Sequence, residues 1–288
     1  MSSYLIKGTA AEGTLRVLAA QTTETVQESS DRHNLSMTAT AALGRLITGA
    51  ALFAQVISKH EKSRVTLRVQ GGGPIGYLLA EGSTDGSVRG YVANPHADLP
   101  PRTTDGKLDV GGLVGNDGDV AVMRLLENTD PYTSSTALVS GEIADDLTFY
   151  LVKSEQVPSA LLLGVYLEGG KVHTAGGLLI QVMPGASEAT LQTLEKNIKS
   201  LGPVTEALRG RSLIEVIEKA TEGLGFEQME EPLPIRLQCR CSREKAIGSI
   251  QYFSEAEREE MIEAGGQEVV CDWCGTRYQI TPQEIREA

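Results

Sequence analysis

Four cysteines are the side chains of this chain best suited to chemistry, and all of them lie in its last fifty residues. Cys239 and Cys241 are separated by one residue, and 29 residues further on Cys271 and Cys274 are separated by two. Four thiolates in two close pairs suit one tetrahedral zinc ion, which binds sulfur well and needs no further ligand. Because the four histidines lie elsewhere, the spacing predicts an all-cysteine site.

The same two pairs have a second chemistry available to them. Each pair could instead oxidise internally, Cys239 with Cys241 and Cys271 with Cys274, and neither bond would join the two halves of the segment. Oxidation would then remove the metal and leave nothing to hold the halves together. A disulfide across a one-residue gap is strained and easily reduced, which suits a reversible switch. On the residues alone, a purely structural zinc ribbon stays open beside this switch.

Short elements around the cysteines must position them. The pattern SEAE at 254–257 is a capping box that begins a helix, and glycines at 265–266 end it. QEVV at 267–270 and TRYQI at 276–280 predict two strands, and TPQE at 281–284 begins a last helix. A module of residues 237–288 buries too little apolar surface to be stable alone. We therefore expect the metal to hold it together.

Residues 1–184 predict an α/β core domain. Residues 31–60 predict one helix with Ser36 as N-cap, and its apolar residues go nearly all the way round, as in a buried helix. RVTLRVQ alternates as a strand does. Further strands are predicted at GYLLAE, SVRGYVA, DVAVMRLL, LTFYLVK, ALLLGVYLE and GLLIQVM. The fold class is thus α+β, a mixed sheet with packed helices.

Residues 185–236 predict a labile helical linker. One short amphipathic helix begins after Ser187 and stops at Gly202 and Pro203, and a second occupies 210–225. Isolated helices of this length are marginal in water and need a surface to lie on. EQMEEPLPIRLQ, with two prolines and three glutamates, then predicts an extended connection. The apolar side chains of the two helices are either a buried face or a surface exposed for binding: Leu191, Leu194, Ile198, Leu213, Ile214 and Ile217.

Composition narrows the classes of function. The net charge of −12 and a pI near 4.9 disfavour a nucleic-acid partner, since phosphate neutralisation supplies most of such affinity. No run of eighteen apolar residues and no signal-peptide layout occurs, so we expect a cytoplasmic protein with no membrane partner. Reducing conditions there favour metal ligands or redox-active thiols over permanent disulfides.

The sequence resembles the heat-shock protein 33 family, the redox-regulated 33 kDa chaperonins. Cys-x-Cys followed after 29 residues by Cys-x-x-Cys resembles the zinc–thiolate centre of that family. So do ALGRLI, GGGPIG, VRGYVANP and GGLLIQVMPGA, which occur in the family's order and, with CRCSREK and CDWCG, span most of the chain.

The resemblance implies an ATP-independent chaperone that is not an enzyme. Reduced members hold one Zn²⁺ per chain through the residues matching Cys239, Cys241, Cys271 and Cys274, and are inactive. Oxidants together with a second stress form the disulfides Cys239–Cys241 and Cys271–Cys274 and release the zinc. The module unfolds, the linker loses structure, and apolar surface becomes available to unfolding client proteins. Active members form homodimers.

Three other classes compete. A thiol–disulfide oxidoreductase would place CDWC at the start of a helix in a βαβ unit. A nucleic-acid-binding zinc ribbon would use Trp273 and Tyr278 for stacking, with Arg277 between them. An enzyme of the first domain would need more than GGGP, which lacks the Lys and Ser or Thr of a phosphate loop and predicts a tight turn.

Overall fold

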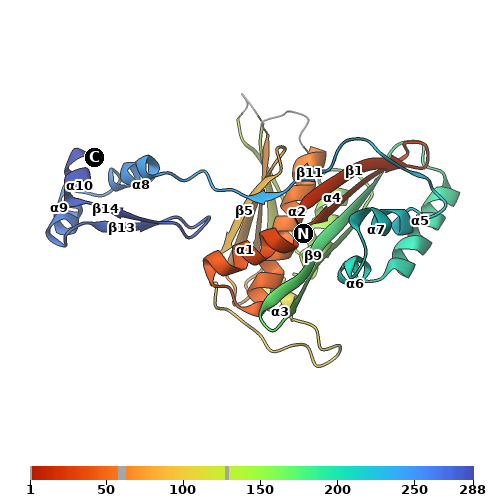
Figure 1. Ribbon diagram of the computed structural model, residues 1–288, viewed down its shortest axis with the longest axis horizontal. Coiled ribbons are helices and arrows are strands. Elements are labelled where there is room, and N and C mark those ends of the chain that lie inside the picture. Colours follow the sequence, from red (N-terminus) through yellow and green to blue (C-terminus); the bar gives the residue numbers. More distant parts are fainter. Residues whose placement is uncertain (1, 58–62, 127–129) are drawn as a thin grey trace. The chain divides into compact units, whose positions relative to one another are not determined.

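The computed structural model describes residues 2–57, 63–126 and 130–288. The chain forms two compact units, Met1–Leu237 and Gln238–Ala288. Two six-stranded sheets belong to the first unit, and one two-stranded sheet belongs to the second. The combination of sheets and packed helices (Figure 1) confirms the α+β fold class expected from the sequence.

The first sheet, called sheet A here, is antiparallel and has the order β10–β1–β2–β9–β8, with β11 also paired to β1. Its strands pair in long registers, for example Leu18 with Leu179 and Leu162 with Leu178. Strand β8 lies at one end of the sheet. The strands are β1 (Tyr4–Ala10), β2 (Leu15–Gln21), β8 (Ser159–Glu168), β9 (Lys171–Val182), β10 (Phe226–Gln228) and β11 (Leu233–Pro234).

The second sheet, called sheet B, has the order β12–β5–β4–β3–β6–β7. Only its pair β12–β5 is parallel; the other neighbours run antiparallel. The GGGP segment predicted as a turn follows β3, and its Gly71 and Gly73 lie against the backbone of Val114 and Gly115, where no Cβ would fit. The strands are β3 (Arg64–Gln70), β4 (Tyr77–Ser83), β5 (Ser87–Val92), β6 (Asp119–Leu125), β7 (Tyr132–Ala137) and β12 (Arg236–Leu237).

Helix α2 (Met37–Ile57) contacts strands of both sheets and shares their core (Figure 1). Ser36 caps it as predicted, because its Oγ accepts the N–H of Ala39 at 3.1 Å. The predicted residues 31–33 belong instead to α1 (Thr23–His33), which ends where Asn34 turns into the left-handed region, φ 50°. Residues 58–60 of the predicted helix lie outside the described residues. Helix α2 is long and apolar enough to cross a membrane, but 78% of its most apolar stretch is buried within the protein.

The other face of sheet A is covered by the helices of the predicted linker. Alternate residues of β2 and β9, such as Val17 and Ile180, point away from α2 and join a second core with Leu194 and Ile217. Ser187 and Ser212 cap two of these helices through their hydroxyls, as Ser187 was expected to do. The covering helices are α5 (Glu188–Leu201), α6 (Val204–Leu208) and α7 (Leu213–Ala220).

Two glycines let α6 approach the sheet closely. Gly164 of β8 and Gly176 of β9 are paired in the register. A Cβ at Gly164 would lie 2.7 Å from the Cγ2 of Thr205 and 2.9 Å from the Cγ1 of Val204. A Cβ at Gly176 would lie 2.6 Å from the Cδ1 of Leu208. Helix α6 is therefore seated where the sheet carries no side chains.

The connection predicted as extended and loose is tied to both sheets. Strands β10 and β11 pair with β1, and β12 pairs with β5. Two backbone hydrogen bonds, from Ile235 N–H to the Ser3 carbonyl and from Met229 N–H to the Lys7 carbonyl, continue this attachment. These few residues carry the chain from sheet A to sheet B and end directly before the cysteine module.

One predicted strand is wrong. LTFYLVK belongs to helix α4 (Ala144–Lys153), where Leu147, Tyr150 and Leu151 are buried at helical spacing. The helix begins there because the Asp146 carboxylate accepts backbone N–H groups of the preceding turn, among them those of Val139 at 2.7 Å and Ile143 at 2.9 Å. The alternation of apolar residues alone could not show this local capping.

Gly164→Ala should loosen α6 from sheet A. The new methyl overlaps two β-branched side chains that cannot swing away, and overpacking of this kind costs about 1–3 kcal/mol. We expect amide hydrogen exchange in 204–220 to become at least about ten-fold faster. Gly248→Ala is the control, since nothing lies within 4 Å of its Cβ position in α8 (Arg243–Ile250). Unchanged exchange over α6 and α7 in the first variant would contradict the close packing described.

Candidate metal centre

The second unit is a small module built around one hairpin and three short helices. Strands β13 (Gln267–Val270) and β14 (Arg277–Ile280) pair antiparallel, and α8 and α10 (Pro282–Glu287) contribute to the same core. Helix α9 (Glu255–Glu263) begins at the predicted capping box on Ser254. The buried apolar side chains of its core are only Ala246, Ile250, Ile280 and Ile285 among the residues described.

These elements bring both cysteine pairs to one place. Cys239 and Cys241 come just before α8, whose N-cap is Ser242. Cys271 follows the last residue of β13, and Cys274 lies in the turn that leads to β14. The Gly275 N–H donates to the Cys271 carbonyl at 2.8 Å and closes this turn. The CDWC motif therefore lies on a hairpin turn and not at the start of a helix, as a thioredoxin-like enzyme would place it.

The four sulfurs form one cluster, and all lie within 4.8 Å of one another. The Sγ atoms of Cys239 and Cys271 are 3.7 Å apart, and those of Cys241 and Cys274 are 3.5 Å apart. Four sulfurs at about 2.3 Å from a tetrahedral zinc would be about 3.8 Å from one another. The residues present thus fit a four-coordinate metal ion. The Cys239–Cys271 and Cys241–Cys274 contacts join the two halves of the module, and all four cysteines are free thiols.

Hydrogen-bond donors surround the sulfurs. The Tyr278 hydroxyl donates to Cys241 Sγ at 3.1 Å, and the Trp273 backbone N–H donates to the Cys271 sulfur. The Thr276 hydroxyl lies 3.2 Å from Cys274 Sγ. Such contacts stabilise charged thiolates and orient them as ligands. From the sequence, Tyr278 was considered only for stacking on nucleic acid. Its position four residues after Cys274, on the strand that leaves the turn, was the available signal.

Burial governs the protonation of the thiols. Removal from water raises the pKa of Cys271, with proximity to Cys239 adding to it, and burial also raises the pKa of Cys241. The hydrogen bond to Cys241 raises the pKa of Tyr278 to about 12. Without a cation, Cys271 and Cys241 therefore favour the neutral thiol at pH 7. A divalent metal ion would supply the positive charge that favours the thiolates.

Three basic residues near the cysteines are paired with other groups of the module. Arg243 donates to both carboxylate oxygens of Glu284 at 2.8 Å and so joins α8 to α10. Arg277 forms an ion pair with Glu268 across the hairpin. Lys245 donates to the Arg240 carbonyl at 2.6 Å. These three cations therefore join elements of the module to one another.

The apolar residues predicted in the linker lie mostly in the second core. Leu194, Leu213 and Ile217 are buried, and Ile198 and Ile214 are partly buried against them. Leu191 is half-buried and lies outside that core. The residues of sheet A that these helices cover, among them Val17 and Ile180, were missed by the sequence analysis. The available signal was the run of consecutive apolar residues in β2 and β9, which indicates strands buried on both faces.

Known proteins share both the sequence and this architecture. A family model described as Hsp33 protein matches residues 3–281. The chain belongs to the heat-shock protein 33 family. A 33 kDa chaperonin of Deinococcus radiodurans is 55% identical over 281 residues, which cover 98% of this chain and 96% of that protein. A 33 kDa chaperonin of Thermus thermophilus is 51% identical over 292 residues, covering 98% and 85%.

A solved structure agrees in fold over the whole chain. The crystal structure of the 33 kDa chaperonin (heat shock protein 33 homologue) of Thermotoga maritima has a TM-score of 0.92 and 36% identity, and the match covers 100% of this chain and 97% of that one. Membership of the heat-shock protein 33 family supports a chaperone role. The sequence resemblance to this family is thereby confirmed, and the four-cysteine cluster that carried it can bind a metal ion.

Glu284→Gln should destabilise the module. The Arg243 guanidinium lowers the pKa of Glu284 to about 2, from an ordinary value of 4.5, and backbone bonding at Thr281 contributes. Glutamine can still accept the capping hydrogen bonds, so the variant removes chiefly the charge. A depressed pKa means stability that is present above pH 4.5 and lost as the pH falls toward 2. The unfolding midpoint of the module should therefore drop by the same amount throughout pH 5–8.

Glu260→Gln is the matched control for this variant. It removes the same charge from α9, where the carboxylate is exposed and no hydrogen bond or ion pair of its side chain is seen in the described part of the chain. An equal loss in both variants would show that net charge, and not the Arg243–Glu284 pair, sets the stability.

Proposed function

We propose that this protein is a redox-regulated, ATP-independent chaperone that holds unfolding client proteins under oxidative stress. In the reduced form one zinc ion binds Cys239, Cys241, Cys271 and Cys274, and the protein is inactive. Oxidation forms the disulfides Cys239–Cys241 and Cys271–Cys274, releases the zinc and activates the chaperone. The observation that carries this proposal is the four-sulfur cluster, which lies in a unit too small to be stable without it.

Zinc is the metal that best suits these ligands. An all-sulfur tetrahedral set favours zinc over magnesium or calcium, which prefer oxygen. Metal binding contributes about 10–16 kcal/mol to the folding of small zinc peptides. A module with four buried apolar side chains, Cys274 aside, has no comparable source of stability. Loss of the ion should therefore unfold it.

The redox step uses the cysteines in pairs. A thiolate attacks peroxide to give a sulfenic acid and water, and the neighbouring thiol then displaces a second water to close the disulfide. Each pair gives up two electrons and reduces one peroxide. Sulfur that is bonded to sulfur no longer binds the metal as a thiolate, so the ion leaves. Reductant reverses both reactions.

Unfolding of the module should spread along the chain into the linker, which we assign to residues 185–236. Strand β12 ends two residues before Cys239, and its parallel pairing with β5 is only two residues long. Beyond it lie the short strands β10 and β11 and the helices α5–α7. Their departure would uncover the apolar side chains of α5–α7 and the face of sheet A that these helices cover, including Val17 and Ile180. Apolar surface of this kind is what a holdase offers to clients.

Other parts of the proposal rest on the family and on composition. We assign the protein to the cytoplasm, with unfolding proteins as partners and a homodimer as the active form. The acidic net charge argues against nucleic acid, and α2, the one described helix apolar enough for a membrane, is largely buried. Conventional enzyme activity is not part of the proposed role.

The central test follows zinc release and client aggregation together. Reduced, zinc-loaded protein is treated with peroxide at mildly raised temperature while a zinc dye and the light scattering of an unfolding client are recorded. About one zinc per chain should leave as scattering is suppressed, and reductant should reverse both changes. Zinc that stays bound, or leaves with no gain in holdase activity, would make the module a structural ribbon.

Cys239→Ser should weaken zinc binding and disturb the switch. A neutral hydroxyl replaces one of four thiolate ligands, so the reduced module should lose zinc to a chelator that leaves the wild type loaded. Arg240→Ser is the control, because it changes the residue between the two ligands and keeps every sulfur. Peroxide activation that is the same in Cys239→Ser and in the wild type would count heavily against the proposed switch.

A further inference from the structure

A cavity of about 530 Å³ runs along the free edge of sheet A. Strand β8 is the end strand of that sheet, and within the described residues no other strand pairs with its outer side. Seven consecutive residues of β8, Leu161–Leu167, line the cavity. Met37, Ala41 and Arg45 of α2 form one wall, and residues 203–206 and Arg209, in and beside α6, form the opposite wall. We call this cavity the β8 groove.

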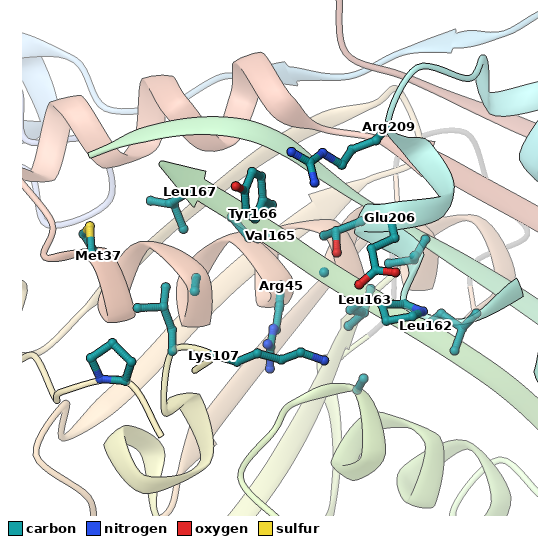
Figure 2. A pocket seen from close by; sticks show the side chains of 18 of the residues that line it. Met37, Arg45, Lys107, Leu162, Leu163, Val165, Tyr166, Leu167, Glu206 and Arg209 are labelled. Atoms are coloured by element: carbon teal, nitrogen blue, oxygen red, sulfur yellow. The ribbon is translucent and has the colours of Figure 1, made fainter. Parts of the chain in front are cut away.

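The two walls lie on opposite faces of the sheet. Leu161, Leu163 and Val165 belong to the core that α2 shares, whereas Leu162 packs in the core that α6 shares. Figure 2 shows Arg45 and Met37 on one side of the strand and Glu206 and Arg209 on the other. The groove therefore extends over both faces of the sheet at its edge. It has space on either side of the position that a strand added to β8 would occupy.

The edge of β8 carries little that would prevent pairing. Between Ser159 and Glu168 the strand reads ALLLGVYL and has no charge, proline or lysine. Its one irregularity, a register shift at Tyr166/Leu167, falls near the end. Native proteins usually block such edges, because unpaired N–H and C=O groups are a template for another strand. In this protein the backbone of β8 instead lines a partly apolar cavity.

We propose that the β8 groove binds an extended segment of an unfolding client as an added strand of sheet A. This inference rests on the proposed function. A polypeptide is the occupant that matches both features, since its backbone pairs with β8 while its alternating side chains enter the spaces on the two faces. The rim carries Lys107 and Arg209 as well as Asp145 and Glu206, so neither sign of charge is excluded. That suits clients of varied sequence.

Helix α6 controls the width of the groove. It lies against Gly164 of β8, and Arg209, just after it, stacks on the Tyr166 ring at 4.7 Å. With α6 in place, the outer-face half of the groove is walled by Val204 and Thr205. Departure of the linker opens that half and leaves the strand edge accessible. The groove thus binds clients in the activated form and is narrowed in the resting form.

The test uses a fluorescent octapeptide of alternating valine and threonine, and the same peptide with backbone amides N-methylated at pairs of consecutive residues, so that both edges of the strand are blocked. Binding to the full-length, peroxide-activated protein is measured by anisotropy. The plain peptide should bind, and N-methylation should weaken binding at least about ten-fold, because the methylated amides cannot donate to β8. Equal binding of the two peptides overturns the proposal.

A strand variant tests the location. Leu162→Lys places a charge on the edge, as natural edge strands do, and should weaken peptide binding at least about ten-fold. Ser135→Lys adds the same charge to an exposed residue of β7, the end strand of sheet B, and should bind as the wild type does. Unchanged binding in Leu162→Lys, with the fold verified by circular dichroism, also overturns the proposal.

Client aggregation separates this inference from the proposed function. If activated wild type suppresses aggregation but neither N-methylation nor Leu162→Lys matters, the chaperone role stands and the β8 groove is not its site. If activated protein binds the peptide at β8 yet suppresses nothing, the groove binds strands but clients are not its occupant. A protein that dimerises through β8 without peptide, and loses the dimer in Leu162→Lys, has a second copy as the occupant and overturns the proposal.

Discussion

Sheet A is apolar on both faces, and much of the structure follows from the need to cover the second one. Helix α2 and sheet B bury one face in a core whose members come almost entirely from residues before the linker. The other face depends on three short helices, the longest of 14 residues. Helices of that size gain most of their stability from the surface beneath them. The helices and the face of sheet A that they cover therefore stabilise each other, because either one alone would expose its apolar side chains to water.

The three helices pack on sheet A, but few contacts hold the chain that follows them. Asn197 of α5 donates to the Glu222 carbonyl at 2.8 Å, and this bond joins the first helix to the end of the third. Beyond Leu224 the chain is held by strands of two or three residues. In the proposed function, a metal ion bound by the four cysteines of the following module would fix the far end of this connection. Oxidation of those cysteines would remove that attachment from the short helices that precede it.

Features set by residues close together in the sequence were predicted, whereas features set by pairing between distant segments were not. The cysteine spacing, the caps at Ser36, Ser187 and Ser254, and the hairpin between Val270 and Arg277 are local, and the structure contains them. LTFYLVK failed because an aspartate of its first turn binds N–H groups that precede the helix. The strands β10–β12 were missed because a strand of two or three residues has no period to detect. Their pairing with β1 and β5 is a property of the fold.

The position of the chain's single tryptophan has a practical consequence. Trp273 stands between two sulfur ligands, and its backbone N–H bonds one of them. Every photon of indole emission from this protein thus originates beside the cysteine cluster, while eight tyrosines and four phenylalanines are spread over the chain. Excitation selective for indole isolates the state of the last fifty residues without a label. Circular dichroism of the amide bands in the same sample reports the sheets and helices. Comparing the time courses of the two signals gives the order in which the parts of the chain unfold.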